Sequence, residues 1–184
     1  MHIITGLGNI GSQYELTRHN VGFMVIDSMA TKLANTSNIN KTNFNADVLK
    51  SGYNLLVKPK TYMNNSGQSV TAIKDYYKVE NENIIVIHDD LDLPFGTVKF
   101  KRGGGHGGHN GLRSLDAHIG NDYLRVRIGI GKPQEKGNVA NYVLSNFSKE
   151  ELNKLEDIIT HTLDAIESLK TDSINEVKSK FTLK

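Results

Sequence analysis

The chain has 184 residues, of which 38% are hydrophobic, and its formal net charge is only +2. This length suits one hydrophobic core and is short for two, so residues 1–184 are predicted to form a single domain. Cysteine is absent, which excludes disulfides, thiolate metal ligands and a cysteine nucleophile. No basic leader precedes the first apolar segment, and no apolar run approaches the roughly 20 residues that span a bilayer, so we expect a cytoplasmic protein without a membrane segment.

The first predicted elements place a histidine between a glycine loop and a helix. Residues 3–5 are apolar and predict a buried strand, which ends at the glycine-rich segment 6–11. Apolar residues then recur at helical spacing over residues 21–33, and Asn20 stands where a helix cap is expected. His19 therefore lies beside the N-terminus of the first predicted helix.

A loop, a hairpin and a second helix follow. Residues 35–43 are rich in asparagine, threonine and serine, which predicts an exposed loop. Residues 44–50 and 53–58 are predicted to form the two strands of a hairpin. Apolar side chains at helical spacing over residues 70–77 predict the second helix, with Asn64 near its start.

The strongest strand signal of the chain lies at residues 84–87 and is followed directly by His88 and Asp89. Open α/β sheets commonly place functional residues at such strand ends. The remaining predicted elements are a strand at 97–101, a glycine run at 103–111, a short helix to about 119, a strand at 123–130, and helices at 139–144 and 148–169. Ser148 and Glu151 have the pattern of a capping box. This order predicts a three-layer α/β/α fold with a mixed, mostly parallel central sheet.

The glycine segment GLGNIG has the form G-x-G-x-x-G, which is typical of dinucleotide-binding loops. In such a site the helix opens at the last glycine and an acidic residue ends the next strand. Here the helix is delayed to residue 21, and the next strands end in lysine. We therefore favour a turn that lets the backbone and Asn9 approach a different ligand.

His19 gains weight as a functional residue only if it has a partner, because a lone histidine is more often structural. Asp89 is a candidate partner, since a carboxylate beside an imidazole fixes its tautomer and stabilises the imidazolium. In a chain without cysteine, the pair predicts a general base that activates water.

Three asparagines, Asn9, Asn64 and Asn110, each stand where a loop meets an element. Each one alone suits a turn. Together they would supply amide groups to hold a carbonyl, an oxyanion or a ribose hydroxyl. Tyr14 and Tyr62 could stack on a nucleobase, although core packing explains Tyr62 equally well.

The histidines and aspartates of residues 88–92 and 106–109 also include the residue types of a metal site. Neighbouring strand residues point to opposite faces, and a glycine loop holds histidines loosely, so we expect no metal.

The segment between Asp92 and Asp116 has no acidic residue but several basic ones, among them Lys101. With Arg125 and Arg127 it predicts a basic patch that binds a polyanion.

Six segments together resemble the bacterial peptidyl-tRNA hydrolase family. They are GLGNIG, TRHNVGF, KPKTYMNNSG, HDDLDLPFG, GGGHGGHNGLRS and RIGIGKP, and they occur in the family's order from the first strand to about Pro133. The family usually has proline in the first loop where this chain has Ile10, a difference that removes no reacting group.

The resemblance implies a cytoplasmic, usually monomeric esterase that needs no cofactor and cuts the bond between a peptide and the terminal ribose of tRNA. It implies that His19 is the catalytic base, that Asp89 keeps it in its basic form, and that Asn9 distinguishes blocked from unblocked aminoacyl-tRNA. The residues that it implies for contact with substrate or tRNA are Tyr14, Tyr62, Asn64, Asn110, Lys101 and Arg127. The main alternative is a non-catalytic RNA-binding module on the same scaffold, and a second is a metallohydrolase.

Overall fold

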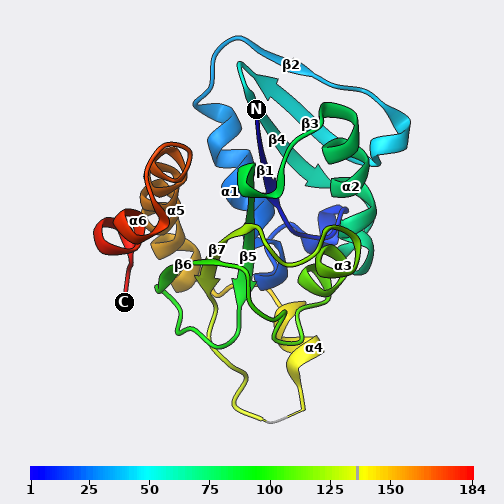
Figure 1. The fold of residues 1–184 in the computed structure, drawn as a ribbon. Coiled ribbons are helices and arrows are strands. Elements are labelled where there is room, and N and C mark those ends of the chain that lie inside the picture. Colours follow the sequence, from blue (N-terminus) through cyan, green and yellow to red (C-terminus); the bar gives the residue numbers. More distant parts are fainter. Residues whose placement is uncertain (136) are drawn as a thin grey trace.

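The computed structural model describes residues 1–135 and 137–184. The strands of these residues form one seven-stranded sheet in the order β2-β3-β4-β1-β5-β7-β6 (Figure 1). Its four central strands are parallel: β4 (Asn54–Pro59), β1 (His2–Gly6), β5 (Ile84–Asp90) and β7 (Leu124–Gly129). The antiparallel neighbours are β3 (Ala46–Ser51) and β6 (Val98–Arg102), and β2 (Thr36–Asn38) forms the edge beside β3. The predicted mixed sheet with a parallel centre is confirmed.

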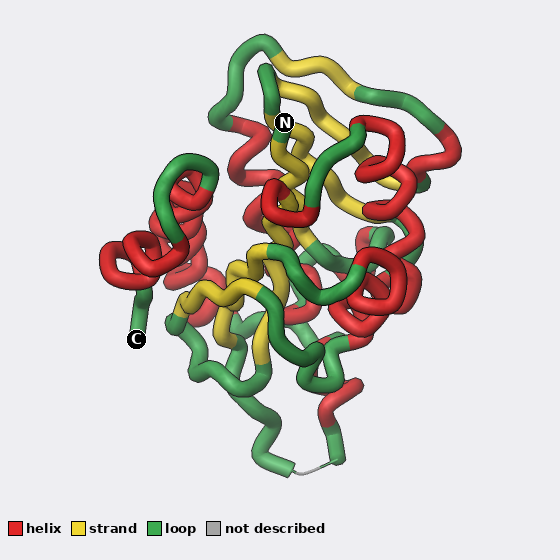
Figure 2. Tube along the Cα trace, in the orientation of Figure 1, coloured by secondary structure: helices red, strands yellow, loops and turns green. Residues whose placement is uncertain are grey.

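Helices cover both faces of the sheet, as the three-layer prediction requires (Figures 1 and 2). One face carries α1 (Val21–Thr31), α5 (Lys149–Leu169) and α6 (Ile174–Phe181), and the other carries α2 (Ser66–Tyr77) and α3 (Asn110–Ile119). The short helix α4 (Val139–Val143) lies beyond the end of the sheet where β5 finishes, and its Val143 belongs to the same core as α1 and α5. No helix of the described ranges is long and apolar enough to cross a membrane.

Two hydrophobic cores form because the central strands bury both of their faces. In β5, Ile84 and Val86 pack under α2 and α3, whereas Ile85 and Ile87 pack under α1 and α5. Successive side chains of a strand point to opposite faces, so a continuous apolar run is needed when helices cover both sides. This explains why residues 84–87 give the strongest strand signal of the chain.

The first turn of α1 lies directly against β1 and β5. A Cβ atom on Gly22 would lie 2.5 Å from the carbonyl oxygen of Ile87 and 2.6 Å from the backbone nitrogen of Leu7. Only glycine permits such a close approach of two backbones. The contact carries the residues just before α1, including His19, to the C-terminal end of β5.

Three features differ from the sequence-based expectations. The loop predicted at residues 35–43 contains β2, whose polar, exposed side chains give no strand signal although its backbone pairs with β3. Asn20 precedes α1, but its side chain makes no cap hydrogen bond. α6 forms a separate helix that the periodicity does not predict. The capping box of Ser148 and Glu151 is confirmed at the start of α5.

Candidate active site

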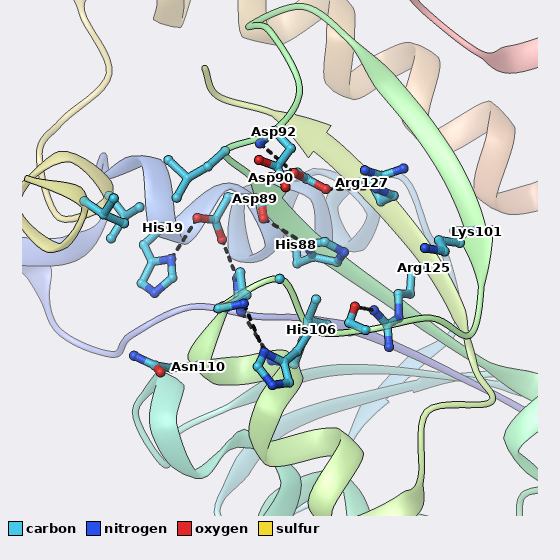
Figure 3. A pocket seen from close by; sticks show the side chains of 18 of the residues that line it. His19, His88, Asp89, Asp90, Asp92, Lys101, His106, Asn110, Arg125 and Arg127 are labelled. Atoms are coloured by element: carbon cyan, nitrogen blue, oxygen red, sulfur yellow. Dashed lines mark hydrogen bonds and ion pairs between the residues drawn. The ribbon is translucent and has the colours of Figure 1, made fainter. Parts of the chain in front are cut away.

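A cavity of about 530 Å³ opens at the C-terminal end of β5 and will be called the main cavity (Figure 3). His19, from the turn before α1, and Asp89, from the end of β5, both line it. His109 and Asn110 enter from the start of α3. An apolar wall is supplied by α4, through Val139, Ala140 and Val143.

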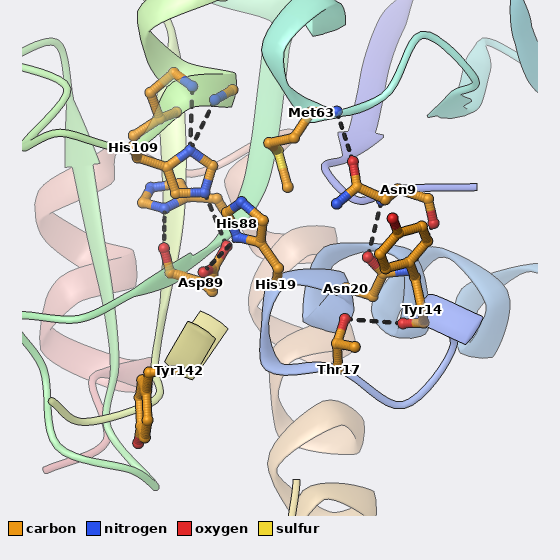
Figure 4. Close-up of polar contacts among 12 residues, drawn as sticks. Asn9, Tyr14, Thr17, His19, Asn20, Met63, His88, Asp89, His109 and Tyr142 are labelled. Atoms are coloured by element: carbon orange, nitrogen blue, oxygen red, sulfur yellow. Dashed lines mark hydrogen bonds and ion pairs between the residues drawn. The ribbon is translucent and has the colours of Figure 1, made fainter. Parts of the chain in front are cut away.

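Asp89 is only 3% exposed and accepts hydrogen bonds from two histidines (Figure 4). Its Oδ2 lies 2.8 Å from Nδ1 of His19, and its Oδ1 lies 2.8 Å from Nε2 of His109. Burial alone would raise the pKa of this carboxyl, but the two imidazoles outweigh burial and hold the pKa well below its usual range. Asp89 is therefore ionised whenever the protein is folded near neutral pH.

The helix that His109 caps determines which of its ring nitrogens accepts and which donates. Its Nδ1 accepts hydrogen bonds from the backbone N–H groups of Gly111 and Leu112, the orphan donors at the start of α3. A nitrogen that accepts cannot carry the proton, so the proton lies on Nε2, which donates to Asp89. His109 thus connects the N-terminus of α3 rigidly to the carboxylate.

The same hydrogen bonds bear on metal binding. His19, Asp89 and His109 place three possible ligand atoms within 4.8 Å of one another. A histidine that binds metal through Nε2 normally donates its other N–H to an acceptor. Nδ1 of His109 instead receives two backbone donors, so ligation through Nε2 would require a ring that carries neither proton. The arrangement therefore suits proton transfer better than metal binding.

His19 bonds Asp89 through one ring nitrogen, Nδ1, and its other ring nitrogen, Nε2, is not part of that contact. Its Nδ1–H donates to Asp89, which leaves the lone pair on Nε2, and the ring lines the main cavity. Burial opposes the charged imidazolium, but the neighbouring Asp89 carboxylate outweighs it, so the pKa of His19 is raised above its ordinary value. A neutral imidazole with a raised pKa is a stronger base than a solvated one.

His88 lines the same cavity and lies beside this group. Its Nδ1 donates to the carbonyl oxygen of Asp89 at 2.8 Å, and its ring meets that of His109 edge-on with centroids 5.3 Å apart. Burial and the nearby His109 lower the pKa of His88 to about 4, so this ring stays neutral. It adds no competing positive charge beside Asp89.

Two of the predicted asparagines have their amide groups oriented. Oδ1 of Asn9 accepts from the backbone N–H of Met63 at 2.8 Å, and the Asn20 side chain bonds both backbone groups of Asn9. Oδ1 of Asn110 accepts from Arg113 at 3.3 Å. In both residues the carbonyl oxygen is engaged, so the NH₂ group is the part left to donate.

The predicted site residues do not all gather in one place. Asn110, Lys101 and Arg127 line the main cavity with His19 and Asp89. Asn9 lines a second cavity of about 490 Å³, together with Asn20, Phe23, Lys58 and Lys60. Each of the two lysines forms an ion pair with an aspartate.

The remaining candidates, Tyr14, Tyr62 and Asn64, line neither cavity. Tyr62 is 51% exposed, so it is not the core residue that its aromatic character allows. Its backbone has a positive φ of 59°, which is costly for a non-glycine residue, and there the chain turns into the 3-10 helix before α2.

The basic patch divides into exposed and internal residues. Lys101 is exposed, and Arg127 pairs with Asp90 at 2.9 Å while it lines the main cavity. Arg125 is only 2% exposed and does not belong to the surface patch. It donates to the carbonyl oxygens of Gly104 and Gly105 and thereby holds the glycine run against β7.

Two contributors to the site are not predicted by the sequence pattern. His109 is a helix cap, a position where serine, threonine, aspartate and asparagine are the usual signals. The sequence predicts Asn20 as such a cap, but its side chain bonds the backbone of Asn9 instead. The sequence pattern places His109 inside the glycine run at 103–111 and suggests it only as a possible metal ligand, whereas α3 begins at Asn110 and makes His109 its cap.

Comparisons with known proteins identify the family of the chain. The family model described as peptidyl-tRNA hydrolase matches residues 3–184. A peptidyl-tRNA hydrolase of Aliarcobacter butzleri is 74% identical over the full length of both chains, and one of Sulfurovum sp. is 54% identical over 100% of this chain and 97% of its own. The crystal structure of peptidyl-tRNA hydrolase from Acinetobacter baumannii has a TM-score of 0.91 and 37% identity, and the match covers 98% of this chain and 94% of that one. The chain therefore belongs to the peptidyl-tRNA hydrolase family.

Proposed function

We propose that this protein hydrolyses the ester bond between a peptide, or an N-blocked amino acid, and the 3′-terminal ribose of tRNA. The observation that carries the proposal is the His19–Asp89 pair, which lines the main cavity with the lone pair of His19 Nε2 not committed to Asp89. A module that only binds RNA has no need of such a pair. Membership of the family supplies the substrate class.

In the proposed reaction His19 is the general base and water is the nucleophile. Nε2 of His19 takes a proton from water as the water oxygen attacks the ester carbonyl, and Asp89 stabilises the imidazolium that results. The proton then passes to the leaving ribose oxygen as the ester bond breaks. The products are free tRNA and a peptide with a new carboxylate.

The oriented asparagines are proposed to hold the substrate around this reaction. The NH₂ group of Asn110, beside His19 in the main cavity, would donate to the developing oxyanion or to a peptide carbonyl. The NH₂ group of Asn9 would donate to the carbonyl oxygen of the acyl group that blocks the amine, an acceptor that a free, charged amine lacks. Tyr14, Tyr62 and Asn64 are proposed as outer contacts of the substrate.

Lys101 and Arg127 are proposed to bind tRNA phosphate. The Nε–H of Arg127 donates to Asp90, which leaves its two terminal nitrogens for a phosphate.

Because His19, Asp89 and His109 come from one chain, we propose that residues 1–184 act as one domain and as a monomer. The family's substrate favours the cytoplasm, where translation occurs.

Hydrolysis of N-acetyl-aminoacyl-tRNA and of free aminoacyl-tRNA by the wild-type protein, with and without a chelator, tests the proposal. We expect release of the N-acetyl-amino acid, sparing of the free aminoacyl-tRNA, and no effect of the chelator. Binding without release would support the RNA-binding module. Activity that a chelator abolishes and metal restores would support a metallohydrolase.

A further inference from the structure

Arg18 directly precedes His19, yet its side chain points to the segment between α4 and α5. One terminal nitrogen, Nη1, lies 2.5 Å from Oγ of Ser145 and 2.9 Å from the carbonyl oxygen of Asn146. The other, Nη2, lies 3.0 Å from Oε1 of Glu151. The side chain is only 13% exposed. These contacts make Arg18 an internal connector between the start of α1 and a segment more than 120 residues later.

Aromatic rings and backbone bonds complete the connection. The guanidinium carbon of Arg18 lies 4.4 Å from the ring centroid of Tyr142, a residue of α4, and 5.8 Å from that of Phe147. The backbone N–H of Arg18 donates to Ser145, and that of Phe147 donates to Leu16, each at 3.0 Å. The end of α4 and the residues that follow it are therefore held both by the Arg18 side chain and by backbone hydrogen bonds to residues 16 and 18.

Glu151 is a fixed partner and not a mobile surface charge. Its Oε1 also accepts the backbone N–H of Ser148 at 2.9 Å, as part of the capping box of α5. An exposed ion pair between two flexible side chains contributes little, because ordering them costs entropy. Here the capping box already orders the Glu151 side chain, so its pair with Arg18 fixes the position of Arg18 relative to the start of α5.

The geometry matters because α4 forms the apolar wall of the main cavity. Val139, Ala140 and Val143 line it on one side, and His19 lines it on another. Arg18 is covalently joined to His19 and stacks on Tyr142, one residue before Val143. The separation between the wall and the base thus depends on the contacts of Arg18.

We propose that Arg18 is a positioning residue that holds α4 at a fixed distance from His19, so that the acyl part of the substrate fits between the wall and the base. The inference rests on the proposed function, because it concerns the same cavity. We assign the acyl part of the substrate to the α4 wall because the side chains of that wall are apolar. The phosphates of the substrate would instead bind Lys101 and Arg127.

The test compares steady-state kinetics of Arg18→Gln and Arg18→Lys with the wild type on N-acetyl-aminoacyl-tRNA. For Arg18→Gln we expect KM to rise about 10-fold with little change in kcat, because substrate is held less well while the base is intact. Arg18→Lys keeps the charge opposite Glu151 but loses the planar fork, so it should recover part of the loss. The pH dependence of kcat should not move, since Asp89 still faces His19.

Lys154→Gln is the matched control, because Lys154 forms an exposed ion pair with Glu150 on the same helix as Glu151. It should leave KM unchanged. Tyr142→Leu removes the ring under Arg18 and should raise KM as Arg18→Gln does, and it decides the question if Arg18→Gln does not fold.

Two results would overturn the inference. One is a lower melting temperature of Arg18→Gln and Tyr142→Leu with KM and kcat both unchanged, which would make Arg18 a structural contact only. The other is a shifted pH profile of kcat, which would mean that Arg18 acts on His19 itself. An inactive wild type would instead contradict the proposed function.

Discussion

At the scale of single residues, Asp89 joins two histidines that have different tasks. His109 is locked as an Nε2–H donor by the backbone of α3, whereas His19 keeps the lone pair of Nε2 on the cavity side. Replacing the carboxylate and replacing the locked histidine should therefore shift the basicity of His19 in opposite directions.

Asp89→Asn should move the acid limb of the kcat–pH profile to lower pH. If His19 is the proposed base, it acts in its neutral form, so activity rises as pH passes its pKa. Asp89 raises that pKa and burial lowers it, hence without the carboxylate only the lowering influence remains. We also expect kcat to fall about 100-fold or more, because an amide can bind the wrong tautomer. An acid limb at the wild-type position would show that Asp89 does not set the pKa of His19.

His109→Asn should move the same limb to higher pH. Asparagine can still cap α3, but it is too short to donate to Asp89. A carboxylate that has lost one donor interacts more strongly with the charged form of His19 and raises its pKa further. His109→Ala, which loses the cap as well, should be less stable by about 1 kcal/mol. A limb that moves to lower pH in His109→Asn would contradict this account.

At the scale of elements, the site depends on how closely α1 approaches the sheet. Gly22→Ala should destabilise the protein by about 3 kcal/mol, because the new Cβ meets the backbone of Leu7 and Ile87, which cannot yield as a flexible side chain can. Urea denaturation measures this change. Gly105→Ala is the control, since nothing lies within 4 Å of its added Cβ, and it should change stability by less than about 0.5 kcal/mol. Equal effects of the two changes would exclude a special role for the approach of α1.

Elements with a strong local signal are predictable from the sequence, and those that depend on neighbours are not. The apolar run of β5 and the capping box of α5 are local patterns, and both appear in the structure. The edge strand β2 has no apolar face, so only its pairing with β3 defines it.

The same division holds for the site. The His19–Asp89 pair follows from a helix start and a strand end that meet at one edge of the sheet. The role of His109 depends on tertiary contacts of a glycine-rich loop, and the placement of Asn9 in a second cavity depends on Asn20 and Met63. No local pattern encodes these contacts.

At the scale of the whole molecule, a net charge of +2 leaves tRNA affinity to the position of the charges. Lys101→Ala and Arg127→Ala should each weaken tRNA binding and reduce the slope of log affinity against log salt by about 1. Hydrolysis of a small ester should change little. Lys154→Ala, on the outer helix α5, should leave the slope unchanged. Identical slopes in all variants would argue against phosphate contact at Lys101 and Arg127.

The most direct test of the central claim is the rate at which the wild type and His19→Ala release N-acetyl-amino acid from N-acetyl-aminoacyl-tRNA. If His19 is the base that activates water, kcat should fall by about 100- to 10,000-fold while tRNA affinity is retained. Wild-type kcat in His19→Ala would contradict the assignment.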